Sequence, residues 1–197
     1  MERPRRRYIR KPGTRRYRKL FIIAAEGLKT EPQYFAIFNN QERSIQVKCL
    51  TDKKGASPPQ VLDRMKRFLR DNGLLKSDEA WLVTDKDQWT DEQLAQLHAW
   101  SLKSPNYGFC LSNPKFEFWL LLHFEDGAGV SSSDSCDKRL NVHIPDYNKG
   151  IDARKISETM IRDAIARAKA RDIPPCTDWP RNLGSTVYRL VESILNT

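Results

Sequence analysis

The stretch LFIIAAEG at residues 20–27 decides the fold. Its six apolar residues end abruptly on Glu26, which is typical of a buried strand that stops at the edge of a parallel sheet. A second apolar stretch, AWLVT at residues 80–84, leads in the same way into Asp85 and Asp87. Because ligands bind at the carboxyl ends of the strands in an open α/β sheet, we expect these carboxylates to meet there.

Glu26, Asp85 and Asp87 form a candidate metal site. Three neighbouring carboxylates repel one another unless a cation lies among them, and hard oxygen ligands suit Mg²⁺ or Mn²⁺. Asp85 and Asp87 are two positions apart on an extended chain, so their side chains project to the same side. Simpler readings stay open, since Glu26 can be a solvated strand end and an Asp-x-Asp sequence can close a turn.

Strand and helix patterns alternate along the rest of the chain, which predicts an α/β fold with a mostly parallel sheet covered by helices on both faces. Residues 20–197 are expected to form one domain that ends in C-terminal helices. Capping boxes are expected at Thr30–Gln33, Ser57–Gln60 and Thr90–Gln93. Strands are expected at 20–25, 45–50, 80–84 and 107–111, and helices at 30–39, 58–72, 91–102, 115–124, 152–171 and 184–195.

The expected helix at 115–124 is apolar nearly all round and should be buried. Glu117 lies within it, and a buried carboxylate without a partner costs several kcal/mol, so Glu117 should reach a metal, a basic group or solvent. His123 lies six positions further on, off the same helical face, and is expected to be a core histidine. Residues 125–150 are expected to be a long connection.

The net charge of +9 is concentrated at the start of the chain. Residues 1–19 hold ten of the 34 Lys and Arg residues, and the remainder of the chain is nearly neutral. Such a basic arm favours binding to nucleic-acid phosphates, with a disordered tail or an arm for an acidic protein as alternatives. The residues expected to contact nucleic acid are Arg5, Arg6, Arg7, Arg15, Arg16 and Lys29.

Several other classes of protein are disfavoured by the sequence. No apolar run approaches the ~20 residues of a transmembrane helix, and no secretory signal is evident. The four cysteines lie far apart without CxxC spacing, so neither a zinc site nor a disulfide framework is indicated and a cytoplasmic location is expected. Phosphate-binding glycine loops and the GxSxG elbow are also missing from the sequence.

The chain resembles the RloB-like family in motifs that follow one another in the same order. These are EGxKTEPxYF at residues 26–35, TDxD at 84–87, SNPxFExWL at 112–120, YNK at 147–149 and NxxxTVYxLV at 182–191. The family resembles the Toprim fold, in which a Glu after the first strand and an Asp-x-Asp after a later strand hold Mg²⁺. This chain departs from the family pattern in two ways. Its middle segment at residues 125–150 is long and polar, and it has no clear counterpart of the third Asp found in some Toprim proteins.

The resemblance implies a metal-dependent nuclease of antiviral defence that works beside an ATPase partner. Asp85 and Asp87 would hold the metal, Glu26 would act as acid, base or metal-linked carboxylate, and Glu117 would complete the site. Lys29, Lys86 or Lys149 would steady negative charge on the phosphate. The alternatives are a non-catalytic nucleic-acid-binding or sensor subunit of a defence complex, and a housekeeping RNA-processing enzyme.

Overall fold

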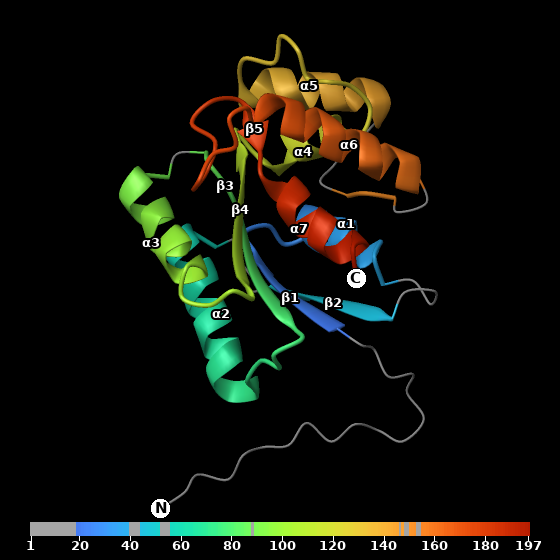
Figure 1. Cartoon of the computed structure of the whole chain (residues 1–197). Helices are drawn as coiled ribbons and strands as arrows, with labels where there is room; N and C mark the ends of the chain where they lie inside the picture. Colours follow the sequence, from blue (N-terminus) through green and yellow to red (C-terminus); the bar gives the residue numbers. More distant parts are fainter. Residues whose placement is uncertain are drawn as a thin grey trace, which may run out of the picture.

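The computed structural model describes residues 19–39, 44–51, 56–87, 89–145, 147, 150–152 and 155–197. In these residues the strands form one five-stranded sheet in the order β2-β1-β3-β4-β5 (Figure 1). The first four strands are parallel, and β5 pairs antiparallel to β4. The strands are β1 (Lys19–Ala25), β2 (Ile45–Leu50), β3 (Glu79–Asp85), β4 (Tyr107–Asn113) and β5 (Gly184–Ser185).

Helices cover both faces of the sheet, as the alternating pattern predicts. One face packs against α2 and α3, and the other packs against the layer that contains α1, α4, α6 and α7, with α5 packed on α4 (Figure 1). None of the helices in the described part of the chain has the length and apolarity that a bilayer span requires. The helices are α1 (Thr30–Ala36), α2 (Pro58–Asn72), α3 (Asp91–Ser101), α4 (Phe116–Leu121), α5 (Ser133–His143), α6 (Glu158–Arg171) and α7 (Val187–Leu195).

Strand β1 is apolar along its whole length because both of its faces are covered. Phe21 and Ile23 pack into the core beneath α1 and α7, whereas Ile22 and Ala24 pack into the core beneath α2 and α3. All four side chains are fully buried. This alternation follows from the two-residue period of a strand, and it is typical of an interior strand of a sheet that is covered on both faces.

The segment expected to be a long connection contains helix α5. Ser132 caps this helix, since its hydroxyl accepts a hydrogen bond from the backbone N–H of Ser135, and Cys136 and Leu140 are buried beneath it. Few other residues of α5 are apolar, so its amphipathic pattern is too weak to stand out in the sequence. Helix α4 is shorter than expected and ends at Leu121.

The expected capping boxes at Ser57 and Thr90 are confirmed, but the one at Thr30 is wrong. The helix that follows β1 begins at Thr30 itself, and the N-cap residue Lys29 makes no side-chain capping bond. The Gln33 side chain instead accepts a hydrogen bond from the backbone N–H of Ile151 at 2.8 Å. A tertiary contact has therefore taken the side chain that a local capping box would use.

The strand order creates a switch point between β1 and β3. From β1 the chain crosses to β2 on one side of it and later returns to β3 on the other side. Parallel crossovers are right-handed, so these opposite moves place α1 and α2 on opposite faces of the sheet. No crossover passes over the carboxyl ends of β1 and β3, and a crevice therefore opens at that point.

Candidate functional site: a carboxylate pocket at the switch point

A pocket of about 830 Å³ lies at the carboxyl ends of β1 and β3. We call it the carboxylate pocket because five acidic side chains line it, including all four acidic residues singled out in the sequence. Its wall comes from the β1–α1 turn, the start of α2, the β3–α3 turn, the start of α4 and the first residue of α5. The acidic side chains are Glu26, Glu31, Asp85, Asp87 and Glu117.

Glu26 directly follows β1 and is held in one orientation by two hydrogen bonds. Its Oε2 accepts from the backbone N–H of Asp85 at 3.2 Å, and its Oε1 accepts from the indole Nε1 of Trp89 at 3.0 Å. Burial raises the pKa of Glu26 to about 7, although these two hydrogen bonds lower it. The charges of Glu31 and Asp87 raise it further. The carboxylate therefore lies in a site with an excess of negative charge.

Glu31 lies beneath the β1–α1 turn, where Gly27 makes room for it. Its Oε1 accepts a hydrogen bond from the backbone N–H of Gly27 at 2.9 Å, and the residue is only 4% exposed. A Cβ atom added at Gly27 would lie 2.1 Å from Glu31 Oε2, so only glycine fits at this position with the carboxylate in place. The glycine that follows Glu26 thus admits a second carboxylate to the pocket.

Asp85 ends β3 and faces the other carboxylates. Its Oδ1 atom is buried and has no hydrogen-bond partner among the described residues. Burial raises the pKa of Asp85 well above its usual range, and the charges of Glu31, Glu26 and Glu117, in that order, raise it further. A buried acceptor without a donor is rare in folded proteins, and this one belongs to a residue that lines the same pocket as four other carboxylates. A cation would fit at such an atom.

Asp87 also lines the pocket but is exposed. Its φ angle of 32° places it in the left-handed region, which aspartate tolerates better than most residues. The turn is held by bonds from the backbone N–H groups of Lys86 and Asp87 to the carbonyl groups of Ser112 and Pro114, at 2.8 and 3.1 Å. The end of β4 therefore fixes how the Asp-x-Asp sequence leaves β3.

Glu117 enters the pocket from the first turn of α4 and is 5% exposed. Its Oε1 accepts a hydrogen bond from the hydroxyl of Tyr147 at 3.0 Å. The same hydroxyl lies 3.0 Å from the hydroxyl of Thr30 at the start of α1. Glu117 is therefore buried and faces inward as expected, but its hydrogen-bond partner among the described residues is a tyrosine hydroxyl and not the metal, basic group or solvent that the sequence predicts.

The described residues contain no group of three or more His, Cys, Asp or Glu side chains already placed to hold a metal ion. The reason is visible in the contacts, because Glu26, Glu31 and Glu117 each turn an oxygen toward a protein donor. Mg²⁺ usually binds through one or two carboxylates and keeps several waters. The donor set and the unpaired Asp85 Oδ1 therefore fit a hydrated divalent ion, although the structure does not present a closed cage for it.

The basic residues expected at the site fall into three groups. Lys29 is exposed on the pocket rim, whereas Lys86 turns away to bind the carbonyl of Trp89 at 2.7 Å and Asp91 at 3.1 Å. Lys149 lies outside the described residues, as do Arg5, Arg6, Arg7, Arg15 and Arg16. The structure therefore brings Lys29 to the carboxylates and does not test the role of the arm.

Three residues of the pocket are not among the site residues predicted from the sequence. The sequence does not single out Trp89 or Lys115, and Glu31 enters only as one position of the EGxKTEPxYF motif. The available signal for Trp89 is its position as an aromatic residue two places after the Asp-x-Asp sequence. No sequence signal marks Lys115, because its place in the pocket wall depends on the direction that the chain takes between β4 and α4.

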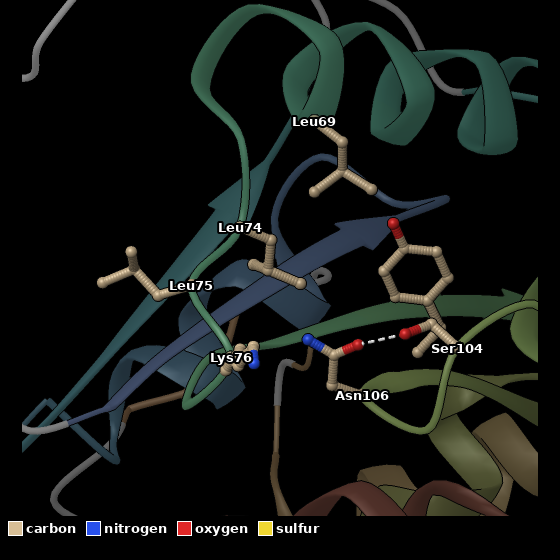
Figure 2. Close-up of a pocket in the computed structure, with 7 residues that line it drawn as sticks. Leu69, Leu74, Leu75, Lys76, Ser104 and Asn106 are labelled. Carbon is tan, nitrogen blue, oxygen red and sulfur yellow. Dashed lines mark hydrogen bonds between the residues drawn. The ribbon is translucent and has the colours of Figure 1, made fainter.

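A second, smaller hollow of about 300 Å³ lies at the opposite end of the sheet, before β3 and β4. Figure 2 shows residues of its lining, among them Leu69, Leu74 and Leu75, and the hydrogen bond that the hydroxyl of Ser104 donates to the side chain of Asn106. None of the described residues that line this hollow is acidic. Of these two hollows, only the carboxylate pocket is lined by acidic side chains among the described residues.

The fold is an open, mostly parallel α/β sheet with carboxylates at its switch point, which is where proteins of this class generally bind their ligands. The chain matches the model of the RloB-like protein family over residues 21–194, which is nearly its whole length. It belongs to the RloB-like family. Comparisons with curated proteins and with solved structures found no match.

Proposed function

We propose that this chain is a metal-dependent phosphodiesterase of Toprim-like architecture that cleaves nucleic acid. The observation that carries the proposal is the buried, unpartnered Oδ1 of Asp85 among the other four carboxylates of the pocket. Hard divalent cations satisfy such a site, and Mg²⁺ or Mn²⁺ supplies Lewis-acid activation of water and neutralisation of charge on a phosphate. The basic arm supports a polyanionic substrate.

The side chains of the pocket have distinct parts in this proposal. Asp85 and Asp87 would hold the cation, with Glu117 completing the acidic wall. Glu26 would take a proton from the attacking water or give one to the leaving oxygen. Its carboxylate is fixed beside Asp85 by hydrogen bonds from the Asp85 backbone N–H and the Trp89 indole. Lys29 at the rim would contact a phosphate of the substrate.

The broader setting is proposed from the family resemblance. The chain would act in antiviral defence, with DNA, RNA or tRNA as substrate and an ATPase as partner. A non-catalytic role as a nucleic-acid-binding or sensor subunit is the second candidate. It is favoured by the lack of a preformed group of metal ligands in the described residues.

Calorimetric titration with Mg²⁺ and Mn²⁺ separates the two candidates. The proposed enzyme binds either ion, and Asp85→Asn abolishes that binding while circular dichroism shows an unchanged fold. Asp63→Asn, which removes an exposed carboxylate on α2, is the matched control and leaves the titration unchanged. No heat of binding for either ion in the unaltered protein would contradict the metal site.

Cleavage is then measured on single-stranded DNA, duplex DNA, RNA and tRNA with Mg²⁺ or Mn²⁺, with and without an ATPase partner. Asp85→Asn should abolish metal-dependent cleavage, because in this proposal it removes the carboxylate on which binding of the cation depends. Cleavage at the unaltered rate in Asp85→Asn would refute the assignment. Binding of nucleic acid without turnover on any substrate would support the sensor role.

A further inference from the structure

Lys115 is a cation on the wall of the carboxylate pocket that the proposed mechanism does not use. It is the N-cap residue of α4, and it lies two positions before Glu117. Its ammonium group forms an ion pair with Asp137 Oδ2 on α5 at 2.6 Å. The Lys115 side chain is 20% exposed and that of Asp137 is 41% exposed, so solvent and ligands reach the pair.

The charge balance of the pocket makes this lysine unusual. Among the described residues that line the pocket, five are acidic and only Lys29 and Lys115 are basic. Burial lowers the pKa of Lys115, but the hydrogen bond to Asp137 and the charges of Glu117 and Asp137 outweigh it and raise the pKa. Lys115 is therefore positively charged at neutral pH, at a place where an entering polyanion needs a cation.

We propose that Lys115 exchanges its ion pair with Asp137 for a contact with a backbone phosphate of the nucleic acid that enters the pocket. The inference rests on the substrate class of the proposed function. In the free protein Asp137 holds the ammonium group at the pocket wall and offsets its charge. A phosphate oxygen offers the same charge-assisted hydrogen bond, and the partly exposed pair is easily exchanged for it.

The salt dependence of binding measures this contact directly. Fluorescence anisotropy of labelled single-stranded DNA and RNA, recorded in EDTA at several KCl concentrations, reports the dissociation constant without cleavage. Lys115→Gln should weaken binding about fivefold at low salt and reduce the slope of log K against log salt by about 0.7, the value for one phosphate contact on a single strand. Lys115→Arg should restore the slope.

Lys138→Gln is the matched control, because it removes an equally charged but exposed lysine on α5 that does not line the pocket. Its slope should stay within error of the unaltered protein. Equal slopes for Lys115→Gln and Lys138→Gln would overturn the proposal. Circular dichroism of each variant shows that the comparison is made between folded proteins.

Asp137→Asn tests the exchange itself. Freeing Lys115 should tighten binding about threefold. This gain should vanish when Lys115→Gln is also present, because no ammonium group is then left to contact the phosphate. The four proteins form a double-mutant cycle that measures the coupling between the two residues. Asp134→Asn, an exposed acidic residue in the first turn of α5, controls for loss of a general repelling charge. A gain that persists in the Lys115→Gln background would show that Asp137 only repels the substrate, and would refute the exchange.

The outcomes for this inference and for the nuclease proposal can be told apart. Binding with the expected Lys115 slope but without cleavage under any condition would leave the phosphate contact standing and remove the enzymatic function. Cleavage by the unaltered protein together with an unchanged slope in Lys115→Gln would refute the Lys115–phosphate contact and leave the nuclease proposal intact. Failure to bind either oligonucleotide in EDTA would overturn the contact as well.

Discussion

Trp89 Nε1 donates a hydrogen bond to Glu26 Oε1 at 3.0 Å, across 63 positions of sequence. The bond joins the turn after β3 to the end of β1, so the Glu26 carboxylate is oriented by the turn that also contains Asp87. Glu26 can therefore perform proton transfer in the proposed reaction only while this loop is in place.

Trp89→Phe should lower metal-dependent cleavage about tenfold, because it removes the indole donor while keeping most of the ring. A positioning effect of that size corresponds to about 1.4 kcal/mol of transition-state stabilisation. Trp81→Phe is the matched control, since Trp81 Nε1 donates to Glu79 Oε2 at 2.7 Å away from the pocket. Single-turnover rates of the two variants are compared, and equal rates would contradict the positioning role of Trp89.

Tyr147→Phe should lower the free energy of unfolding by about 1–2 kcal/mol, because Glu117 loses the hydroxyl that donates to its buried carboxylate. If a divalent ion occupies the pocket, it binds the folded state alone and saturating Mg²⁺ should recover part of the loss. Urea unfolding with and without Mg²⁺ measures both effects. Tyr107→Phe, at the far end of the sheet, serves as the control and should show no added response to Mg²⁺.

His123 predicts a stability that depends on pH. The ring is buried, and its Nδ1 lies 3.0 Å from the carbonyl of Trp119, which can only accept, so Nδ1 carries the proton and Nε2 accepts from the hydroxyl of Tyr34. Burial lowers the pKa of His123 from its ordinary value of 6.5 to about 4. The unfolded chain therefore binds more protons than the folded chain between these values, and stability is lost as pH falls from 6.5 toward 4.

The expected size of the His123 contribution is about 3 kcal/mol over that range, at about 1.4 kcal/mol per pH unit. It is measured as the difference in pH dependence of unfolding between the unaltered protein and His123→Gln in metal-free buffer. The comparison with His123→Gln is required because Glu26 gives the stability an opposite pH dependence. The pKa of Glu26 is raised in the folded protein, so its contribution to stability is lost as pH rises toward 7. Parallel pH profiles for the two proteins would contradict a neutral buried His123.

Asn39 protects the outer edge of the sheet. Its side-chain amide donates to the carbonyl of Val47 at 2.9 Å and accepts from the N–H of Val47 at 2.7 Å, as a neighbouring strand would. Because β2 is the edge strand, Asn39→Ala should expose two backbone groups, lower stability by about 1–2 kcal/mol and promote association. Urea unfolding measures the loss of stability and light scattering measures association. Asn72→Ala, at an exposed position, is the control: it should change the free energy of unfolding by no more than about 0.5 kcal/mol and leave the scattering unchanged.

The parallel core was predictable because burial on both faces imposes continuous apolar runs that end on polar residues. The strands that contain Phe21 and Leu82 are predicted in this way, whereas the edge strand that contains Val47 is predicted from its alternation of apolar and polar residues. The two-residue strand β5 was missed because two residues carry no period. Helix α5 was missed because its buried face consists of little more than Cys136 and Leu140.

The candidate site was predictable where it depends on strand ends and not where it depends on packing. Glu26 and Asp85 follow strands, so parallel pairing alone brings them together. Trp89 and Lys115 reach the pocket through turns whose geometry is set by contacts with β4 and α5. Glu31 is admitted by the missing side chain of Gly27, a steric relationship that sequence spacing does not reveal.

Strand β1 begins at Lys19, where the basic arm joins the domain, and Glu26 follows its other end. The strand has 7 residues, so the two points are separated by about 23 Å at about 3.3 Å per residue. One nucleotide advances about 3.4 Å along its strand, and this separation corresponds to about seven nucleotides. A substrate held at that junction and cut at the switch point must therefore be an oligomer, and a dinucleotide would meet only one end of the protein.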